Sequence, residues 1–207
     1  MRIFLLDMSG VTAEQVEALA HTLPPMRRAD AERCKRKGYY EQSVLGFCLV
    51  RYAVRQIAPV ADTESWLYGR NGKPRLTQGF PFFNLSHTPY GVAVAVDEVG
   101  EVGIDLEEIT PHPTLATRAL SPAEERLAIL SDDPTSELIR FWSAKEAKVK
   151  YTGEGIRSLS ELRNVTTDGV QSERICLGGF PHWLSVCPTA EMPPITYVTA
   201  AQLLALQ

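Results

Sequence analysis

Apolar and polar positions follow two different periods along the first quarter of the chain, and each change of period predicts a new element. Residues 2–7 (RIFLLD) form a short apolar run that predicts a strand. A helix is expected to begin at Thr12, because apolar positions then recur at helical spacing until Pro24 and Pro25 end the pattern. Residues 39–57 show the same spacing over a longer stretch, which predicts the main core helix of this region.

The middle of the chain changes to the two-residue period that is typical of strands. Turn-forming pairs separate the apolar runs, first Asn71 with Gly72 and then Thr88 with Pro89. The predicted strands cover residues 65–68, 82–87, 90–97 and 99–109.

Helical spacing returns after residue 120. Ser121, followed by Pro122 and by Glu124, has the pattern of a capping box at a helix start. A long helix is predicted over residues 134–151, and Gly153 ends it. Further strands are expected at about 162–166, 170–177, 182–187 and 195–200, before a tail that forms either a short helix or a frayed end.

The order of strand, helices and strands occurs twice, and the divide falls near residue 100. This order predicts an α+β fold with two similar α/β halves, residues 1–100 and residues 101–207. A chain of 207 residues is long enough to bury a core as one compact unit or as two small subdomains.

Composition and charge narrow the class of protein. The chain is 44% hydrophobic and 22% charged, which is typical of a soluble globular protein. No apolar run approaches the length of a membrane helix, and the first ten residues do not form a secretory signal, so we expect a cytoplasmic protein without a membrane partner. The net charge of −4 argues against a general nucleic-acid-binding protein.

Two stretches carry the candidate chemistry. On the strand VGIDLEEI (residues 102–109), the two-residue period sends Asp105 and Glu107 to one side and Glu108 to the other. On the predicted helix FWSAKEAKVK (residues 141–150), the spacing of four places Glu146 and Lys150 on one face with Trp142. Three carboxylates with a lysine form a plausible site for Mg²⁺ and a polyphosphate, and Mn²⁺ has similar oxygen chemistry.

These two stretches, with NGKP (residues 71–74) and FNLSHT (residues 83–88), resemble the ordered motifs of the 4′-phosphopantetheinyl transferases. The resemblance implies a monomer of two subdomains, related by a pseudo-twofold, with the active site in the cleft between them. It also implies Mg²⁺-dependent transfer of phosphopantetheine from coenzyme A to a serine of an acyl or peptidyl carrier protein, with release of adenosine 3′,5′-bisphosphate. The N-terminal half would contact the nucleotide, and the C-terminal half would hold the metal.

The resemblance also suggests roles for the charged residues of the second half. The implied metal ligands are Asp105, Glu107 and Glu146. Lys150 and Lys145 would neutralise the leaving phosphate or donate a proton to it. Glu124 is a candidate for the base that activates the serine hydroxyl or for a further metal ligand, whereas a plain helix cap is the alternative. Glu146 is a second candidate for the base.

Binding of coenzyme A is expected to involve the first half. Ser86 and His87 match family residues that contact its phosphates, and Lys73 is a weaker candidate of the same kind. Gln42 stands where the family usually carries an arginine, so the pattern departs here. Nearby basic residues either compensate for the missing charge or form a solvated helix face. They are Arg33, Lys35, Arg36 and Lys37.

The expected protein partner is an acidic carrier protein, which the basic segment at residues 33–37 would attract. Apolar contact around Leu115, Ala119 and Leu120 is a second docking hypothesis. Two alternatives remain open: a non-catalytic module that binds coenzyme A or a carrier protein, and another Mg²⁺-dependent nucleotide phosphotransferase. The absence of a Walker loop or a kinase-like glycine loop counts against the second alternative.

Overall fold

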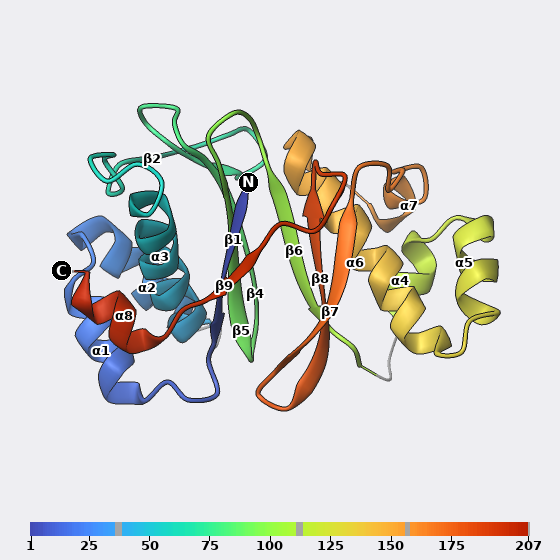
Figure 1. The fold of residues 1–207 in the computed structure, drawn as a ribbon, viewed down its shortest axis with the longest axis horizontal. Helices are drawn as coiled ribbons and strands as arrows, with labels where there is room; N and C mark the ends of the chain where they lie inside the picture. Colours follow the sequence, from blue (N-terminus) through green and yellow to red (C-terminus); the bar gives the residue numbers. More distant parts are fainter. Residues whose placement is uncertain (36–38, 111–113, 156–157, 207) are drawn as a thin grey trace.

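The computed structural model describes residues 1–35, 39–110, 114–155 and 158–206. Two sheets lie next to each other at the centre of the molecule, and helices pack on their outer sides (Figure 1). The fold is therefore α+β, as the order of elements predicted. None of the helices in the described ranges is long and apolar enough to cross a membrane.

The first sheet is buried on both faces. Its strands, in spatial order, are β4 (Phe82–Thr88), β5 (Gly91–Asp97), β1 (Arg2–Asp7) and β9 (Ile195–Tyr197). Along β1, Phe4 and Leu6 pack toward the helices, whereas Ile3 and Leu5 pack toward the second sheet. The outer helices of this half are α1 (Ala13–His21), α2 (Pro25–Lys35), α3 (Tyr40–Arg55) and α8 (Ala200–Ala205).

The second sheet contains β6 (Gly103–Glu108), β8 (Phe180–Cys187) and β7 (Gln171–Leu177), with β8 in the middle. The long helix α6 (Pro134–Thr152) packs against β6 and β8. Gly103 permits the close approach of this helix, since a Cβ there would lie 2.0 Å from the carbonyl oxygen of Ala147. The other helices of this half are α4 (Thr114–Ala119), α5 (Pro122–Ile129) and α7 (Leu159–Leu162).

Strand β4 of the first sheet lies beside β6 of the second, and polar side chains link the two strands. The side-chain oxygen of Asn84 accepts a hydrogen bond from the backbone amide of Ile104 at 3.1 Å. Between the sheets, the alanines at 93 and 95 leave room for the larger side chains of Ile104 and Leu184. This junction fixes where the carboxylates of β6 stand relative to β4.

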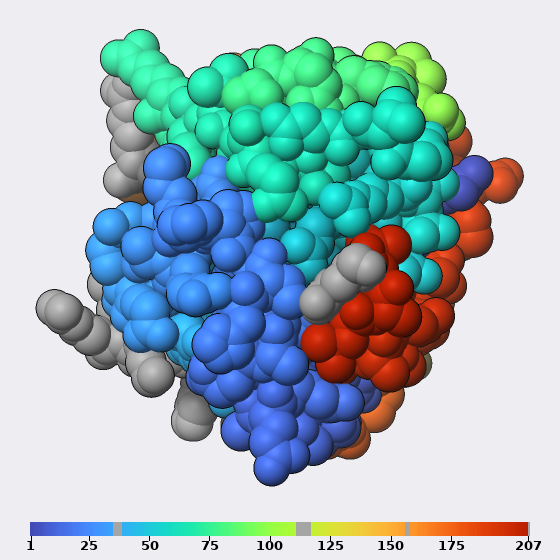
Figure 2. All heavy atoms as spheres, turned by 90° about the vertical axis from the view of Figure 1, so that its left-hand side faces the viewer, coloured from blue at the N-terminus to red at the C-terminus, as the bar shows by residue number. Residues whose placement is uncertain are grey.

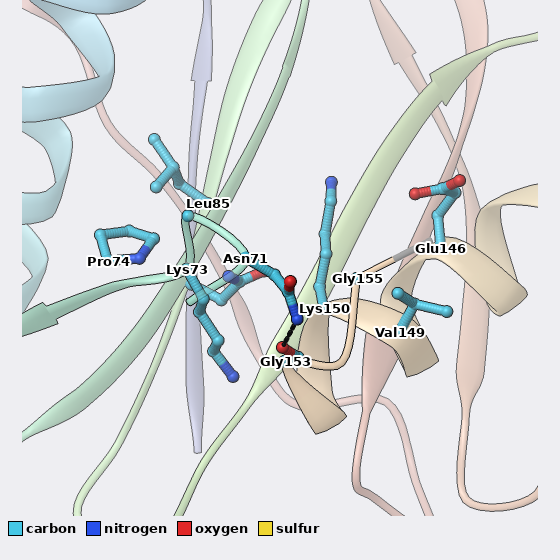
Figure 3. Close-up of a pocket in the computed structure, with 11 residues that line it drawn as sticks. Asn71, Lys73, Pro74, Leu85, Glu146, Val149, Lys150, Gly153 and Gly155 are labelled. Atoms are coloured by element: carbon cyan, nitrogen blue, oxygen red, sulfur yellow. Dashed lines mark hydrogen bonds between the residues drawn. The ribbon is translucent and has the colours of Figure 1, made fainter. Parts of the chain in front are cut away.

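A short hairpin of β2 (Trp66–Tyr68) and β3 (Pro74–Leu76) leaves the first half and ends near the C-terminus of α6. The sequence predicted β2 and the turn at Asn71 and Gly72, whereas β3 was not expected. Figure 3 shows the turn of this hairpin against the end of α6.

The structure corrects two expectations about the C-terminal region. The segment expected as a strand at 162–166 contains no strand among its described residues, and its first residue is the last residue of the short helix α7. The division at residue 100 also fails for the end of the chain. Strand β9 pairs with β1, and Val198 and Leu203 join the core of the first half. Figure 2 shows this red segment lying against the blue N-terminal helices. The expected pseudo-twofold relation stays a prediction.

Candidate active site

A lysine and a carboxylate from different elements form the centre of the site. Lys150 of α6 donates hydrogen bonds to Oδ1 of Asp105 on β6 at 2.7 Å and to Oγ of Ser86 on β4 at 2.9 Å. The hydroxyl of Ser86 also donates to the same carboxylate oxygen at 3.2 Å. The motifs that carry these three residues are far apart in the sequence, and the junction of β4, β6 and α6 brings them together.

Two further carboxylates, those of Glu107 and Glu146, lie near Asp105. Glu107 accepts a hydrogen bond from the indole Nε1 of Trp142 at 3.0 Å, which confirms that the strand and helix faces meet. Burial, and then the negative charge of Asp105, raise the pKa of Glu107 to about 7. Burial, and then the charge of Asp105, likewise raise the pKa of Glu146 to about 7. The positive charge of Lys150 therefore does not balance the three acidic groups.

One oxygen of the Asp105 carboxylate lacks a ligand in the described part of the chain. Its Oδ2 atom is buried without a hydrogen-bond partner among the described residues, and only 2% of the residue is exposed. Buried carboxylate oxygens are normally satisfied by a donor or a cation. Within the described ranges, no three acidic, histidine or cysteine side chains already converge on a single metal position. The oxygen-rich donor set and the orphaned Oδ2 atom nevertheless fit a hard divalent cation at Asp105, Glu107 and Glu146.

A pocket of about 410 Å³ opens beside this cluster (Figure 3). The turn of the β2–β3 hairpin and strand β4 form one wall, and the C-terminal half of α6 forms the other. Glu146 and Lys150 line it directly, so both charged groups of the helix are accessible to a bound molecule. The remaining lining residues are Asn71, Gly72, Lys73, Pro74, Asn84, Leu85, Val149, Gly153 and Gly155.

The three lysines singled out in the sequence have different surroundings. An ammonium group has three hydrogens to donate. Lys73 donates to Glu101 at 2.7 Å, to the carbonyl of Val102 at 2.9 Å and to the carbonyl of Tyr151 at 3.1 Å. Among the described residues, Lys150 has only Asp105 and Ser86 as partners, and 29% of its side chain is exposed. Lys150 therefore retains donor capacity toward the pocket.

The structure corrects the expectation that Lys145 neutralises the leaving phosphate. The residue is fully buried, and its ammonium lies 2.7 Å from the carboxylate of Glu124. It also contacts the backbone carbonyls of Ala119 and Leu162 at 3.2 and 2.8 Å, and that of Arg163 at 3.3 Å. Because no face of this ammonium reaches solvent, Lys145 ties α6 to the segments around α4 and α7 instead.

Glu124 adopts the helix-cap geometry that was the alternative to a catalytic role. Its carboxylate accepts a hydrogen bond from the backbone amide of Ser121 at 2.7 Å, and the hydroxyl of Ser121 accepts from the amide of Glu124. The same carboxylate oxygen pairs with Lys145. Both contacts are made by Oε2 of Glu124, and Glu124 is not among the residues that line the pocket beside Lys150.

The basic segment is only partly described. Arg33 is exposed and pairs with Asp30 on the same helix, so the observed contact is that of a solvated helix face. Arg36 and Lys37 lie outside the described residues, as does the side chain of Lys35. Their expected contacts with coenzyme A stay predictions.

Gln42 is buried and lines a second pocket of about 220 Å³ together with His87. Sequence reasoning missed the guanidinium of Arg27, which lines this pocket together with Asp30, stacks on the ring of Trp66 at 4.4 Å and hydrogen-bonds to Tyr68. Partial desolvation of the imidazole by neighbouring groups, and then the charge of Lys150, lower the pKa of His87, although the residue as a whole is exposed. No periodic signal distinguishes Arg27 from the other basic residues nearby.

The second docking hypothesis is also corrected in part. Ala119 and Leu120 belong to the core between the helices of the second half, with 0% and 1% of their surface exposed. They cannot contact a partner without rearrangement. The side chain of Leu115 lies outside the described residues.

Comparison with known proteins gives consistent matches. The family model described as "4'-phosphopantetheinyl transferase superfamily" matches residues 101–198, the part of the chain that contains β6 and α6. The 4'-phosphopantetheinyl transferase psf-1 of Bacillus pumilus is 32% identical over 75% of this chain and 70% of its own length.

Two other relatives support the same grouping over shorter stretches. The 4'-phosphopantetheinyl transferase AcpT of Escherichia coli strain K12 is 32% identical over 65% of this chain and 67% of its own length. The 4'-phosphopantetheinyl transferase HetI of a Nostoc species is 38% identical over 48% of this chain, and the match spans 46% of HetI.

Proposed function

The chain belongs to the 4′-phosphopantetheinyl transferase superfamily, and we propose that it transfers the 4′-phosphopantetheine group of coenzyme A to a serine of an acyl or peptidyl carrier protein, releasing adenosine 3′,5′-bisphosphate. The observation that carries this proposal is the contact of Lys150 with Asp105 at the mouth of a pocket that Glu146 also lines. A carboxylate cluster that can hold a cation, next to an ammonium group with a free N–H donor, is suited to binding a pyrophosphate.

Mg²⁺ would be held by Asp105, Glu107 and Glu146, and it would supply positive charge to the pyrophosphate oxygens. The support for this assignment is the partnerless Oδ2 atom of Asp105 and the raised pKa of both glutamates. A divalent cation would balance this excess of negative charge. Mn²⁺ is the competing ion, because its preference for oxygen ligands is similar.

Lys150 would act on the leaving group. Two of its three donors contact Asp105 and Ser86, which hold the ammonium at the junction of the strands. The third is available to a phosphate oxygen in the pocket, where it would stabilise the charge that develops on adenosine 3′,5′-bisphosphate as the bond breaks. Phosphoryl transfer depends mainly on such positioning and charge neutralisation.

The serine hydroxyl of the carrier protein must lose a proton during its attack on the β-phosphate. Of the two candidate bases, Glu146 lines the pocket, whereas Glu124 is occupied by Ser121 and Lys145. The geometry therefore favours Glu146 over Glu124 for proton removal, either directly or through a water molecule. Ser86 and His87 lie on β4 beside the cluster and would contact the phosphates of coenzyme A from that side.

The substitution Glu146→Gln separates this enzyme from a protein that only binds coenzyme A or a carrier protein. It keeps the size of the side chain and removes its charge. We expect metal-dependent transfer to fall by about a hundredfold, because the neutral amide cannot take the proton of the serine hydroxyl and is a weaker ligand for the cation. Affinity for the carrier protein, measured by titration calorimetry, is expected to stay unchanged. If Glu146→Gln binds the carrier protein as tightly and transfers phosphopantetheine as fast as the unaltered protein, the proposal is contradicted.

A further inference from the structure

We infer that Lys73 is a positioning residue, which fixes the C-terminal end of α6 and thereby Lys150, and that it is not a ligand of the substrate phosphates. This inference rests on the proposed function for its effect on turnover, whereas the contacts that support it are properties of the structure alone. It replaces the expectation that Lys73 binds coenzyme A.

The first support is that the ammonium of Lys73 is saturated. Its three donors match three acceptors, namely the carboxylate of Glu101 at 2.7 Å and the carbonyls of Val102 and Tyr151 at 2.9 and 3.1 Å. The residue is only 9% exposed. A phosphate could bind this group only if one of these contacts broke.

The second support is the direction of the side chain. In Figure 3 the ammonium of Lys73 points away from the carboxylate of Glu146 and from the ammonium of Lys150. Its aliphatic part passes close to Gly153, another residue of the pocket lining, where an added Cβ would lie 3.5 Å from Cδ of Lys73. The ammonium of Lys73 is therefore directed toward Glu101 and two backbone carbonyls, and not toward the charged groups of the pocket.

The third support is the position of the three groups that accept hydrogen bonds from Lys73. Tyr151 is the neighbour of Lys150 and lies in the last turn of α6, where carbonyl groups have no partner within the helix. Glu101 and Val102 directly precede β6, the strand that carries Asp105. Lys73 thus joins the end of the helix that carries the lysine to the start of the strand that carries its carboxylate partner.

The neighbouring residue Asn71 strengthens the same connection. Its side-chain amide donates to the carbonyl of Gly153 at 3.0 Å (Figure 3). It also donates to the carbonyl of Glu154. Gly153 ends α6 in the left-handed conformation at φ 70°. The turn of the β2–β3 hairpin consequently holds the carbonyl groups on both sides of the helix end.

The test compares Lys73→Met with Arg75→Gln. Arg75 pairs with the same carboxylate, Glu101, at 3.0 Å but does not contact α6. For Lys73→Met we expect kcat for phosphopantetheine transfer to fall by roughly 10- to 100-fold, since a small displacement of a catalytic group has effects of this size. The Kd for coenzyme A, measured by titration calorimetry without a carrier protein, is expected to change by less than about twofold. Arg75→Gln should keep both values.

Glu101→Ala distinguishes the two roles of Lys73 most sharply. If Lys73 positions α6, Glu101→Ala also lowers kcat. The double variant with Lys73→Met then has a kcat only slightly lower than that of Lys73→Met alone. If Lys73 binds phosphate, removal of Glu101 frees its ammonium, so coenzyme A binds as tightly as before or more tightly and turnover persists. An increase of tenfold or more in the Kd of Lys73→Met with kcat preserved would overturn the inference.

Hydrogen exchange gives a measurement that does not require turnover. The backbone amide of Gly153 donates to the carbonyl of Val149 at 2.9 Å. We expect this amide to exchange faster in Lys73→Met and in Glu101→Ala than in Arg75→Gln, because the end of α6 loosens. Unchanged exchange in both variants would refute the positioning role even if the unaltered protein proved inactive on every carrier protein. Inactivity alone would instead count against the proposed function.

Discussion

Lys150 donates a hydrogen bond to Oδ1 of Asp105 at 2.7 Å, while Oδ2 of the same carboxylate is buried without a partner. One oxygen of Asp105 therefore orients the lysine, and the other has no partner among the described residues. In the proposed site, this division would put a metal ligand and a phosphate-binding ammonium on the same carboxylate, so that β6 and α6 would act together on one pyrophosphate.

Replacement of Lys150 tests its assigned role in charge stabilisation. We expect Lys150→Met to lower kcat for transfer by about a hundredfold or more, because the leaving phosphate loses the ammonium group of the pocket lining that keeps a free N–H donor. Lys148→Met is the matched control on the same helix, since Lys148 lies outside the pocket lining, donates to the carbonyl of Asp168 at 2.7 Å and lies over the ring of Tyr151 at 5.7 Å. A Lys150→Met enzyme that turns over as fast as Lys148→Met would exclude the assignment.

The raised pKa of Glu146 predicts a pH-dependent stability of the metal-free protein. The pKa is about 7 in the folded state against an ordinary value of 4.5, so folding takes up a proton between these values. The contribution of this group to stability therefore falls as the pH rises through that window. Glu146→Gln removes the effect, and its melting temperature relative to the unaltered protein should rise between pH 5 and pH 8.

The measurement is thermal unfolding in buffer that contains EDTA, with Glu98→Gln as the control at an exposed glutamate. Adding Mg²⁺ at pH 8 should stabilise the unaltered protein more than Glu146→Gln, because the ion binds the ionised carboxylate. A difference in melting temperature that stays constant from pH 5 to pH 8 would show that Glu146 is not titrating in this range.

Close packing of α6 on β6 predicts a strict requirement for glycine at residue 103. A Cβ there would lie 2.0 Å from the carbonyl oxygen of Ala147 and 2.4 Å from the amide nitrogen of Tyr151, both of which are backbone atoms. We expect Gly103→Ala to cost about 1–3 kcal/mol of unfolding free energy, as overpacking does, and to lower kcat by moving α6 away from Asp105.

Gly100→Ala is the matched control for this substitution, because an added Cβ at residue 100 meets no atom within 4 Å. Urea denaturation and the transfer rate measure the two effects separately. Equal stability and equal turnover in both alanine variants would mean that the separation of α6 from β6 does not matter for the site.

The buried pair of Lys145 and Glu124 predicts a large structural effect. Lys145→Met leaves the carboxylate of Glu124 without its ion-pair partner at 2.7 Å, and breaking such a buried pair typically costs about 3–5 kcal/mol. Adding Glu124→Gln removes the unpaired charge and should restore part of the loss. Denaturant unfolding of both single variants and the double variant measures this coupling. Strictly additive losses would show that the two side chains do not interact.

Sequence patterns predicted the parts of this structure that depend on local spacing. The helix over 134–151 agrees with α6, and Gly153 caps it as predicted. The two-residue period put Asp105 and Glu107 on one side of β6, and the four-residue spacing put Glu146 and Lys150 on the face of α6 with Trp142. The hydrogen bond from Trp142 to Glu107 shows that these faces meet. These inferences succeeded because each depends on the geometry of one element, together with one contact between neighbouring elements.

Contacts between distant segments could not be predicted in this way. The sequence presents Lys73, Lys145 and Lys150 as three similar lysines near acidic motifs, whereas tertiary contacts saturate the first two and leave donor capacity on the third. The pairing of β9 with β1 joins residues at opposite ends of the chain. The four residues of α7 are too few to show a helical period.

The most direct test of the central claim is intact-mass spectrometry of apo carrier proteins incubated with this protein, coenzyme A and Mg²⁺, with and without EDTA. The account predicts that a carrier protein gains the mass of one phosphopantetheine group, that replacing its acceptor serine by alanine prevents the gain, and that EDTA abolishes it. A gain that persists in EDTA would contradict the metal site at Asp105, Glu107 and Glu146. No gain on fatty acid, polyketide or nonribosomal peptide carriers, with coenzyme A still bound, would contradict the proposed transfer.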